Sequence, residues 1–180
     1  MGEEPPVILD VISSGGFLFY YGEPAVGKTR LAGLLARNLE SAGFRPCYIA
    51  TEAGSIAVED RLFAVSMDHM LEILFKCLTQ GRPAIIDTIN SYYTGERSEA
   101  KIMALAAAIS RASSLPVIAA GQVRGEGSPW GGVWVEPWAT HVAVVERLKP
   151  GVSVIRFIKP RRVVAAFRVG AGVRGSVEWI

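Results

Sequence analysis

Residues 22–29 read Gly22-Glu23-Pro24-Ala25-Val26-Gly27-Lys28-Thr29, which is a complete GxxxxGK[ST] phosphate-binding loop, or P-loop. It lies between an apolar run over residues 17–21 and a second run over 31–39. This strand–loop–helix context turns successive backbone N–H groups toward one anion, and it argues against a glycine-rich turn that binds nothing. We expect Lys28 to neutralise the β- and γ-phosphates of a nucleotide and Thr29 to place its hydroxyl on Mg²⁺.

The rest of the chain alternates short apolar runs with amphipathic segments, as expected for an α/β fold. The expected helices cover 28–41, 68–78 and 98–113, with Asp68 and Ser98 as N-caps. The expected strands are 17–21, 46–50, 84–87 and 116–120, followed by 140–148, 152–159 and 163–169. We therefore predict a mostly parallel central sheet that is flanked by helices and ends in an antiparallel C-terminal meander.

Length and hydropathy limit the class of protein. The 180 residues, of which 50% are hydrophobic, suit one compact domain over 1–180. No apolar run approaches the ~18 residues that a membrane span needs, so we expect no membrane partner. The acidic, proline-rich start of the chain is unlike a signal peptide, which predicts a cytoplasmic protein.

Cysteine and histidine are rare and isolated in this sequence. Cys47 and Cys77 lie in apolar surroundings without CxxC spacing or a neighbouring histidine. This arrangement favours buried free thiols over a metal site or a disulfide. His69 and His141 have no carboxylate or thiol at metal-ligand spacing, so no chemical role is expected for them.

Two of the expected strands lead into carboxylates. The strand 84–87 ends in Asp87, at the sheet edge where a nucleotide and its metal are bound, so we predict that Asp87 is a Walker B residue. The alternative is an Asp that caps a turn. Glu52 follows the strand 46–50, and hydrolysis by water needs a base beside the γ-phosphate. Glu52 therefore favours an NTPase over a kinase.

Several segments occur in the order of the RecA/RadA recombinase core. They are Ser14-Gly15-Gly16, the P-loop, Tyr48-Ile49-Ala50-Thr51-Glu52, Ile85-Ile86-Asp87-Thr88, Gly121-Gln122-Val123 and Trp130-Gly131-Gly132. The chain resembles this family over most of its length, and it is most similar to the short archaeal RadA paralogues of RadB type. The resemblance implies a RecA-like P-loop NTPase core that binds ATP and Mg²⁺ at a subunit boundary.

The resemblance also implies roles for single residues. Glu52 would activate water, Asp87 would lie near Mg²⁺, and Gln122 would sense the γ-phosphate and lead into a DNA-binding loop. Arg61, in Glu59-Asp60-Arg61-Leu62, is similar to an arginine that stacks on adenine in this family. The loop that follows Gln122 is short, so strand exchange of the recombinase kind is not expected.

The last quarter of the chain is basic, because residues 141–180 carry eight Lys or Arg and only two Glu. Such a charge is typical of a polyanion partner, a solvated surface or a subunit contact. Within it, Lys159-Pro160-Arg161-Arg162 resembles the Lys-x-Arg pair that RadB-like and KaiC-like proteins present to the γ-phosphate of a neighbouring subunit. We favour this role for Lys159 and Arg161; a DNA-phosphate contact and a solvated turn are the alternatives.

Tryptophans recur every four residues beside a basic loop. Trp130 and Trp134 lie close to Arg124 in the sequence, and unpaired bases could stack on the two indoles while the arginine contacts phosphates. The alternative is that the indoles pack under the sheet or in a subunit interface, which the large area of an indole favours.

Together these features predict a slow, DNA-stimulated ATPase that acts as an accessory protein in homologous recombination and DNA repair. The expected partners are single-stranded DNA, a recombinase or another recombination protein, and further copies of the chain with ATP at their interface. Two alternatives stay open: a nucleotide-gated mediator with little turnover, and a KaiC-like signalling ATPase without a direct DNA role. Salt-sensitive DNA binding would argue against the signalling ATPase.

Overall fold

The computed structural model describes residues 6–52, 61–92, 96–123, 137–159, 164–169 and 177–180. Within these ranges nine strands form one sheet in the order β3-β2-β4-β5-β1-β6-β7-β8-β9. The strands are β1 Phe17–Gly22, β2 Cys47–Ala50, β3 Arg61–Phe63, β4 Ala84–Asp87, β5 Val117–Gln122, β6 His141–Lys149, β7 Val152–Lys159, β8 Val164–Val169 and β9 Val177–Trp179. The helices are α1 Pro6–Ser14, α2 Lys28–Ser41, α3 Met67–Thr79 and α4 Glu96–Ser113.

The direction of the strands confirms the predicted fold class. All pairings from β3 to β6 are parallel, and the pairings β6–β7, β7–β8 and β8–β9 are antiparallel. The sheet is therefore mostly parallel at its centre and ends in an antiparallel meander. Because β1, β2, β4 and β5 run the same way, their carboxyl ends lie at one edge of the sheet, where α/β proteins bind their ligands.

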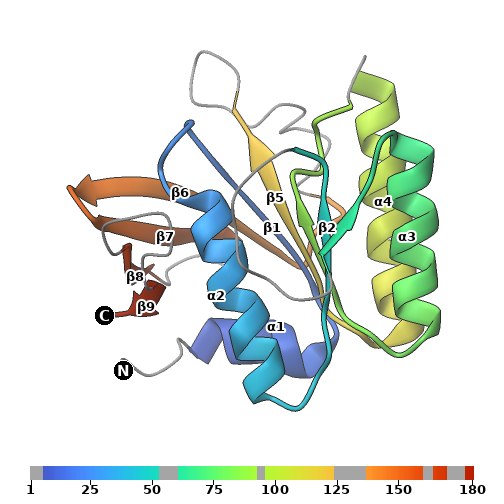
Figure 1. Ribbon diagram of the computed structural model, residues 1–180, viewed down its shortest axis with the longest axis horizontal. Coiled ribbons are helices and arrows are strands. Elements are labelled where there is room, and N and C mark those ends of the chain that lie inside the picture. Colours follow the sequence, from blue (N-terminus) through green and yellow to red (C-terminus); the bar gives the residue numbers. More distant parts are fainter. Residues whose placement is uncertain (1–5, 53–60, 93–95, 124–136, 160–163, 170–176) are drawn as a thin grey trace.

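Helices cover both faces of the sheet (Figure 1). Side chains alternate along a strand, so Leu18 and Tyr20 of β1 face the cluster that includes α1 and α2. Phe17 and Phe19 face the other cluster, which includes α3 and α4. Among the described residues, no helix has both the length and the apolar character to cross a membrane.

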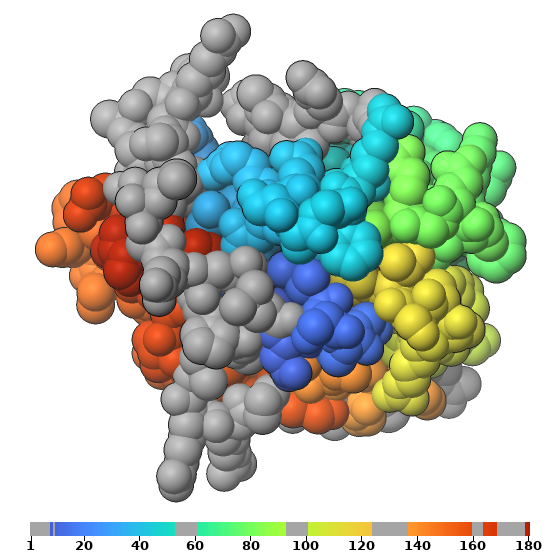
Figure 2. All heavy atoms as spheres, turned by 90° about the horizontal axis from the view of Figure 1, so that it is seen from below, coloured from blue at the N-terminus to red at the C-terminus, as the bar shows by residue number. Residues whose placement is uncertain are grey.

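Helix α1 is absent from the sequence prediction, and its blue atoms lie next to those of α2 on the face that Figure 2 shows. The Ser110 hydroxyl donates to the Gly15 carbonyl oxygen at 2.8 Å, which joins the end of α1 to α4. His141 Nε2 lies 3.1 Å from Asp10 Oδ2, which joins α1 to β6. The contact with Asp10 gives His141 a place in the packing of α1 against the sheet.

The predicted N-caps of two helices are wrong. Helix α3 begins at Met67, and its N-cap is Ser66, whose hydroxyl accepts from the His69 N–H at 3.2 Å. Ser66 has the extended backbone of an N-cap, whereas Asp68 lies in the first turn, where a carboxylate stabilises the helix dipole instead. Helix α4 begins at Glu96, so Ser98 is also inside the helix and not its cap.

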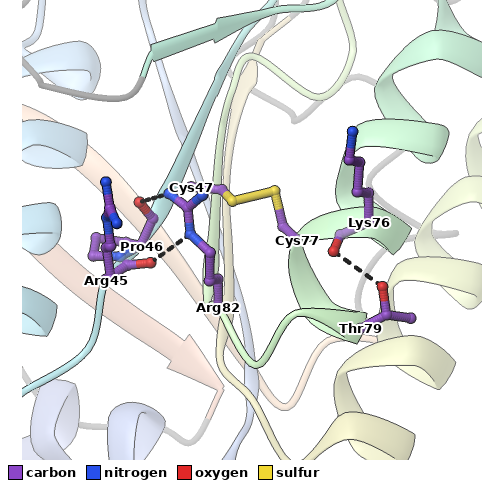
Figure 3. Close-up of a disulfide and its surroundings, with 7 residues drawn as sticks. All are labelled: Arg45, Pro46, Cys47, Lys76, Cys77, Thr79 and Arg82. Atoms are coloured by element: carbon purple, nitrogen blue, oxygen red, sulfur yellow. Dashed lines mark hydrogen bonds between the residues drawn. A yellow bond between two sulfur atoms is a disulfide. The ribbon is translucent and has the colours of Figure 1, made fainter.

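The prediction of free thiols is wrong as well, because Cys47 and Cys77 form a disulfide (Figure 3). Cys47 begins β2 and Cys77 lies in the last turn of α3, with their Cα atoms 6.2 Å apart. Both residues are buried. Arg82 flanks the bond and donates to the backbone carbonyls of Arg45 and Pro46 at 3.0 and 3.2 Å. The pairing follows from the packing of α3 on β2, which spacing in the sequence does not reveal.

Candidate functional site

The P-loop joins β1 to α2, as its sequence predicts. Gly22 ends β1 next to β6, where a Cβ atom would collide with the carbonyl oxygen of Val145. Gly27 precedes α2 with a φ of 101°, a left-handed conformation that glycine adopts without strain. The N-cap residue Gly27 has no side chain, so it makes no side-chain capping hydrogen bond to the first turn of α2. Such a helix N-terminus is suited to an anion.

Lys28 is folded back over the loop that precedes it. Its Nζ donates to the carbonyl oxygens of Gly22 and Glu23, both at 2.8 Å. Burial lowers the pKa of Lys28, and the negative charges of Asp87, Glu52 and Glu23 counteract this. The ammonium group is therefore held at the loop among carboxylates, where a bound polyphosphate would add further compensation for its burial.

Asp87 is the last residue of β4, and two hydroxyl groups are hydrogen-bonded to its carboxylate. The Tyr48 phenol donates to Asp87 Oδ2 at 2.7 Å, and the Thr29 side chain is also hydrogen-bonded to the carboxylate. Burial raises the pKa of Asp87, while the hydrogen bonds from Tyr48 and Thr29 and the charge of Lys28 counteract it. Burial and the nearby Asp87 likewise raise the pKa of Tyr48 far above its usual range.

The donor atoms of Thr29 and Asp87 fit Mg²⁺. Both supply hard oxygen, and Mg²⁺ in nucleotide sites is held by one or two such groups together with phosphates and water. The described residues hold no cluster of three or more His, Cys, Asp or Glu side chains that could form an all-protein metal cage. The two protein oxygens of Thr29 and Asp87 suit a cation whose remaining ligands are phosphate and water.

Glu52 lies beyond the end of β2, and three donors meet one of its oxygens. Glu52 Oε1 accepts from Gln122 Nε2 at 2.5 Å, from Thr88 Oγ1 at 2.9 Å and from Ser91 Oγ at 2.9 Å. Gln122 ends β5, and Thr88 follows β4. The parallel strands thus bring Glu52 and Gln122, which are 70 residues apart in the sequence, into direct contact.

Lys28, Glu52 and Gln122 line one open cavity of about 520 Å³. A volume of this size is typical of sites for small molecules and cofactors. Its walls come from the P-loop, from the start of α2 and from the ends of β2, β4, β5 and β6. The lining residues are Pro24, Ala25, Gly27, Lys28, Thr29, Arg30, Glu52, Thr88, Gln122 and Arg147.

Arg147 is a residue of this cavity that the sequence analysis missed. It lies near the end of β6 and donates from Nη2 to the P-loop carbonyl of Ala25. The charge count already placed Arg147 in the basic quarter of the chain. Only the parallel pairing of β6 with β1 shows that the end of β6 lies beside the P-loop.

The predicted residues Arg61 and Lys159 do not line the cavity, and four other predicted residues lie outside the described ranges. Arg61 does not line the cavity; its Nη2 donates to the Glu52 carbonyl at 3.0 Å, and its Cζ lies 4.5 Å from the centre of the Phe63 ring. Stacking of Arg61 on adenine stays a prediction. The remaining predicted residues outside the described ranges are Arg124, Trp130, Trp134 and Arg161.

Lys159 lies away from the P-loop of its own chain. It pairs with Val142, which in turn pairs with Phe19, three residues before Gly22. Three residues of strand span about 10 Å, so the P-loop begins well beyond the level of Lys159. Lys159 Nζ donates to the Ala139 carbonyl at 2.8 Å. This position does not favour a contact with a nucleotide bound to the same chain.

The strand order and the P-loop together define a RecA-like P-loop fold. No family model matches the sequence, and no curated protein matches it. The structure is similar to that of the KaiC-like protein PH0186 from the hyperthermophilic archaeon Pyrococcus horikoshii OT3. The TM-score is 0.68 at 15% sequence identity, over 94% of this chain and 91% of that chain. At this identity the similarity establishes the fold alone.

Proposed function

We propose that this protein binds ATP with Mg²⁺ and hydrolyses it slowly, as a DNA-stimulated accessory protein of homologous recombination and DNA repair. The observation that carries the ATPase proposal is the convergence of Lys28, Thr29 and Glu52 on one cavity, with Asp87 hydrogen-bonded to Thr29 beneath it. Phosphoryl transfer to water requires positive charge at the phosphates, a metal ligand and a base. Lys28 and the N-terminus of α2 supply the first, Thr29 and Asp87 are candidate metal ligands, and Glu52 is the candidate base.

Each of these residues has a distinct part in the proposed reaction. The P-loop N–H groups and Lys28 bind the phosphates and hold the γ-phosphate in place. Thr29 and Asp87 would hold Mg²⁺, which when bound supplies positive charge to the phosphate oxygens. Glu52 orients a water and takes its proton as the water attacks the γ-phosphate.

The DNA part of the proposal rests on charge and on Gln122. Among the described strands, cationic side chains at the surface of the basic quarter are Arg147, Lys149, Arg156, Lys159 and Arg168. The segment that contains Arg124, Trp130 and Trp134 follows Gln122 directly in the sequence, and Gln122 contacts Glu52. DNA bound to that segment could therefore change the position of the proposed base through a single side chain. A cytoplasmic location is part of this proposal.

ATP turnover measured with and without single-stranded DNA tests the proposed function. We expect slow Mg²⁺-dependent turnover that rises severalfold with an oligonucleotide, and DNA binding that weakens as salt increases. The Lys28→Ala variant should lose ATP binding and serves as the control for contaminating ATPases. Turnover that DNA does not change, together with no salt-sensitive DNA binding, would overturn the recombination role in favour of a signalling ATPase.

Assembly gives a second test, motivated by the position of Lys159. If Lys159 and Arg161 reach the γ-phosphate of a neighbouring copy, specific ATPase activity should rise with protein concentration. A mixture of the Lys28→Ala chain and the Lys159→Ala/Arg161→Ala chain should also recover turnover, because each variant keeps the half-site that the other lacks.

The DNA-contact alternative predicts the opposite pattern. In that case the double variant keeps its basal turnover at every protein concentration, loses affinity for all DNA sequences alike, and shows a salt dependence reduced by roughly one unit per lost contact. That result would reject the contact between neighbouring subunits.

A further inference from the structure

A short segment after β4, residues 88–92, connects the ends of several strands through its side chains. Thr88 and Ser91 donate to Glu52, which follows β2. The Tyr92 hydroxyl lies 3.2 Å from the Thr51 carbonyl oxygen and 2.6 Å from the Ala64 carbonyl oxygen, where it can donate to the chain after β2 or after β3. We call residues 88–92 the bracket segment.

Asn90 of the bracket segment fixes the backbone of Gln122. Its Nδ2 donates to the Gln122 carbonyl at 3.2 Å, and its Oδ1 accepts from the Gln122 N–H at 3.0 Å. Asn90 is buried, which leaves its amide side chain few alternative partners. One segment thus sets the positions of both Glu52 and Gln122.

Ser91 lies at the centre of a cluster of hydroxyl groups. Its Oγ is 2.9 Å from Glu52 Oε1, 2.7 Å from Thr51 Oγ1 and 3.0 Å from Thr88 Oγ1. A hydroxyl carries one hydrogen, and a carboxylate is the strongest acceptor within reach. Donation from Ser91 to Glu52 leaves Thr51 to donate to Ser91 or to the Thr88 carbonyl, which lies 2.7 Å away.

The two carboxylate oxygens of Glu52 differ in their hydrogen bonds. All three side-chain donors described around Glu52, namely Gln122, Thr88 and Ser91, meet Oε1. Of the two oxygens, Oε2 is therefore the one left to accept a hydrogen bond from water. A general base acts efficiently only when its accepting lone pair is directed at the proton it removes.

We propose that the bracket segment positions the base: Ser91 and Thr88 hold Glu52 through Oε1 so that Oε2 meets the attacking water, while Asn90 holds Gln122 against the same oxygen. Ser91 is then a positioning residue that does not touch the nucleotide. This inference rests on the proposed function, because it gives the bracket segment a part in ATP hydrolysis.

Ser91→Ala tests the proposal, with Ser91→Thr as the variant that keeps the hydroxyl. We expect kcat for ATP to fall about tenfold in Ser91→Ala, the magnitude typical of a lost hydrogen bond to a charged group. The Kd for ATP should stay within twofold, and Ser91→Thr should recover most of the activity. The control is Thr79→Ala, which removes an exposed hydroxyl bonded to the Lys76 carbonyl and should leave kcat unchanged.

The proposal is wrong if Ser91→Ala turns over ATP at the rate of the parent protein, or if Ser91→Ala and Ser91→Thr lose kcat equally. A parallel loss of kcat, ATP affinity and thermal stability in Ser91→Ala would also overturn it, since that pattern indicates a purely structural residue.

A second measurement keeps the inference separate from the proposed function. If the parent protein hydrolyses no ATP, the hydrolytic function fails and the positioning of a base fails with it. In that case amide hydrogen exchange tests the hydrogen bond between Asn90 and the Gln122 N–H. Asn90→Ala should speed exchange of the Gln122 N–H at least tenfold, and Asn90→Asp, which keeps the accepting oxygen, should not. Equal exchange in both variants and the parent would reject that connection.

Discussion

Glu52→Gln is expected to bind ATP as tightly as the parent protein and to hydrolyse it at least about a hundredfold more slowly. The amide of Gln keeps the size and an acceptor oxygen of the carboxylate, so the contacts with Thr88, Ser91 and Gln122 can largely persist. It cannot take a proton from water, and a group that acts mainly in the transition state affects kcat without affecting substrate affinity. Equilibrium binding of a fluorescent ATP analogue and single-turnover hydrolysis measure the two quantities separately.

Lys28→Ala is the matched control, because it removes a charge that binds the phosphates in the ground state as well. It should lose affinity and turnover together, whereas Glu52→Gln should lose turnover alone. Equal hydrolysis rates in Glu52→Gln and the parent protein would show that another group activates water, and the assignment of Glu52 would be abandoned.

The sequence predicts the P-loop region closely because several independent signals coincide there. The motif gives both ends of the loop, and Gly27 precedes the first residue of α2. The helix covers Lys28–Ser41 as predicted. The end of β4 at Asp87 was predicted for a similar reason, since an apolar run that stops at a carboxylate marks both the strand and its end. Strong local signals of this kind do not depend on the rest of the fold.

Elements without such signals were missed. Strands β3 and β9 are only three residues long each, too short for an alternating pattern to be seen. Helix α1 begins at Pro6, and the proline-rich start of the chain obscured it, although proline is common in the first turn of a helix. Its buried residues Ile8, Val11 and Ile12 show helical spacing once the helix is known.

The candidate site was predicted in part. Lys28, Glu52 and Gln122, which line the cavity, were predictable because each belongs to a motif. Ser91 and Asn90 belong to none of these motifs, and their partners lie 39 and 32 residues away. Their contacts arise only when β2, β4 and β5 are placed side by side. Pairing across strands is a property of the fold, so local sequence patterns could not predict it.

The disulfide illustrates the same limit and has consequences for stability. It joins two residues separated by 30 positions, so it closes a loop of about that length in the unfolded chain. A crosslink over such a loop lowers the entropy of the unfolded state by an amount equivalent to about 3–4 kcal/mol at 25 °C. Disulfides persist in the cytoplasm mainly in hyperthermophilic organisms. Because a cytoplasmic location is predicted, experiment should test whether this bond forms in solution.

The Cys47→Ala/Cys77→Ala variant is therefore expected to lose about 3–4 kcal/mol of unfolding free energy, which lowers Tm by roughly 10 °C in a domain of this size. Alanine avoids placing an unpaired hydroxyl in the buried space that both cysteines occupy. The parent protein in excess dithiothreitol should match the variant, and thiol titration of the unfolded, unreduced parent should find no free thiol. ATP turnover at 25 °C should change less than twofold, because Cys47 begins β2 while Glu52 follows its opposite end. Two titratable thiols in the unreduced parent, or equal stability of the parent with and without reductant, would show that the bond does not form in solution.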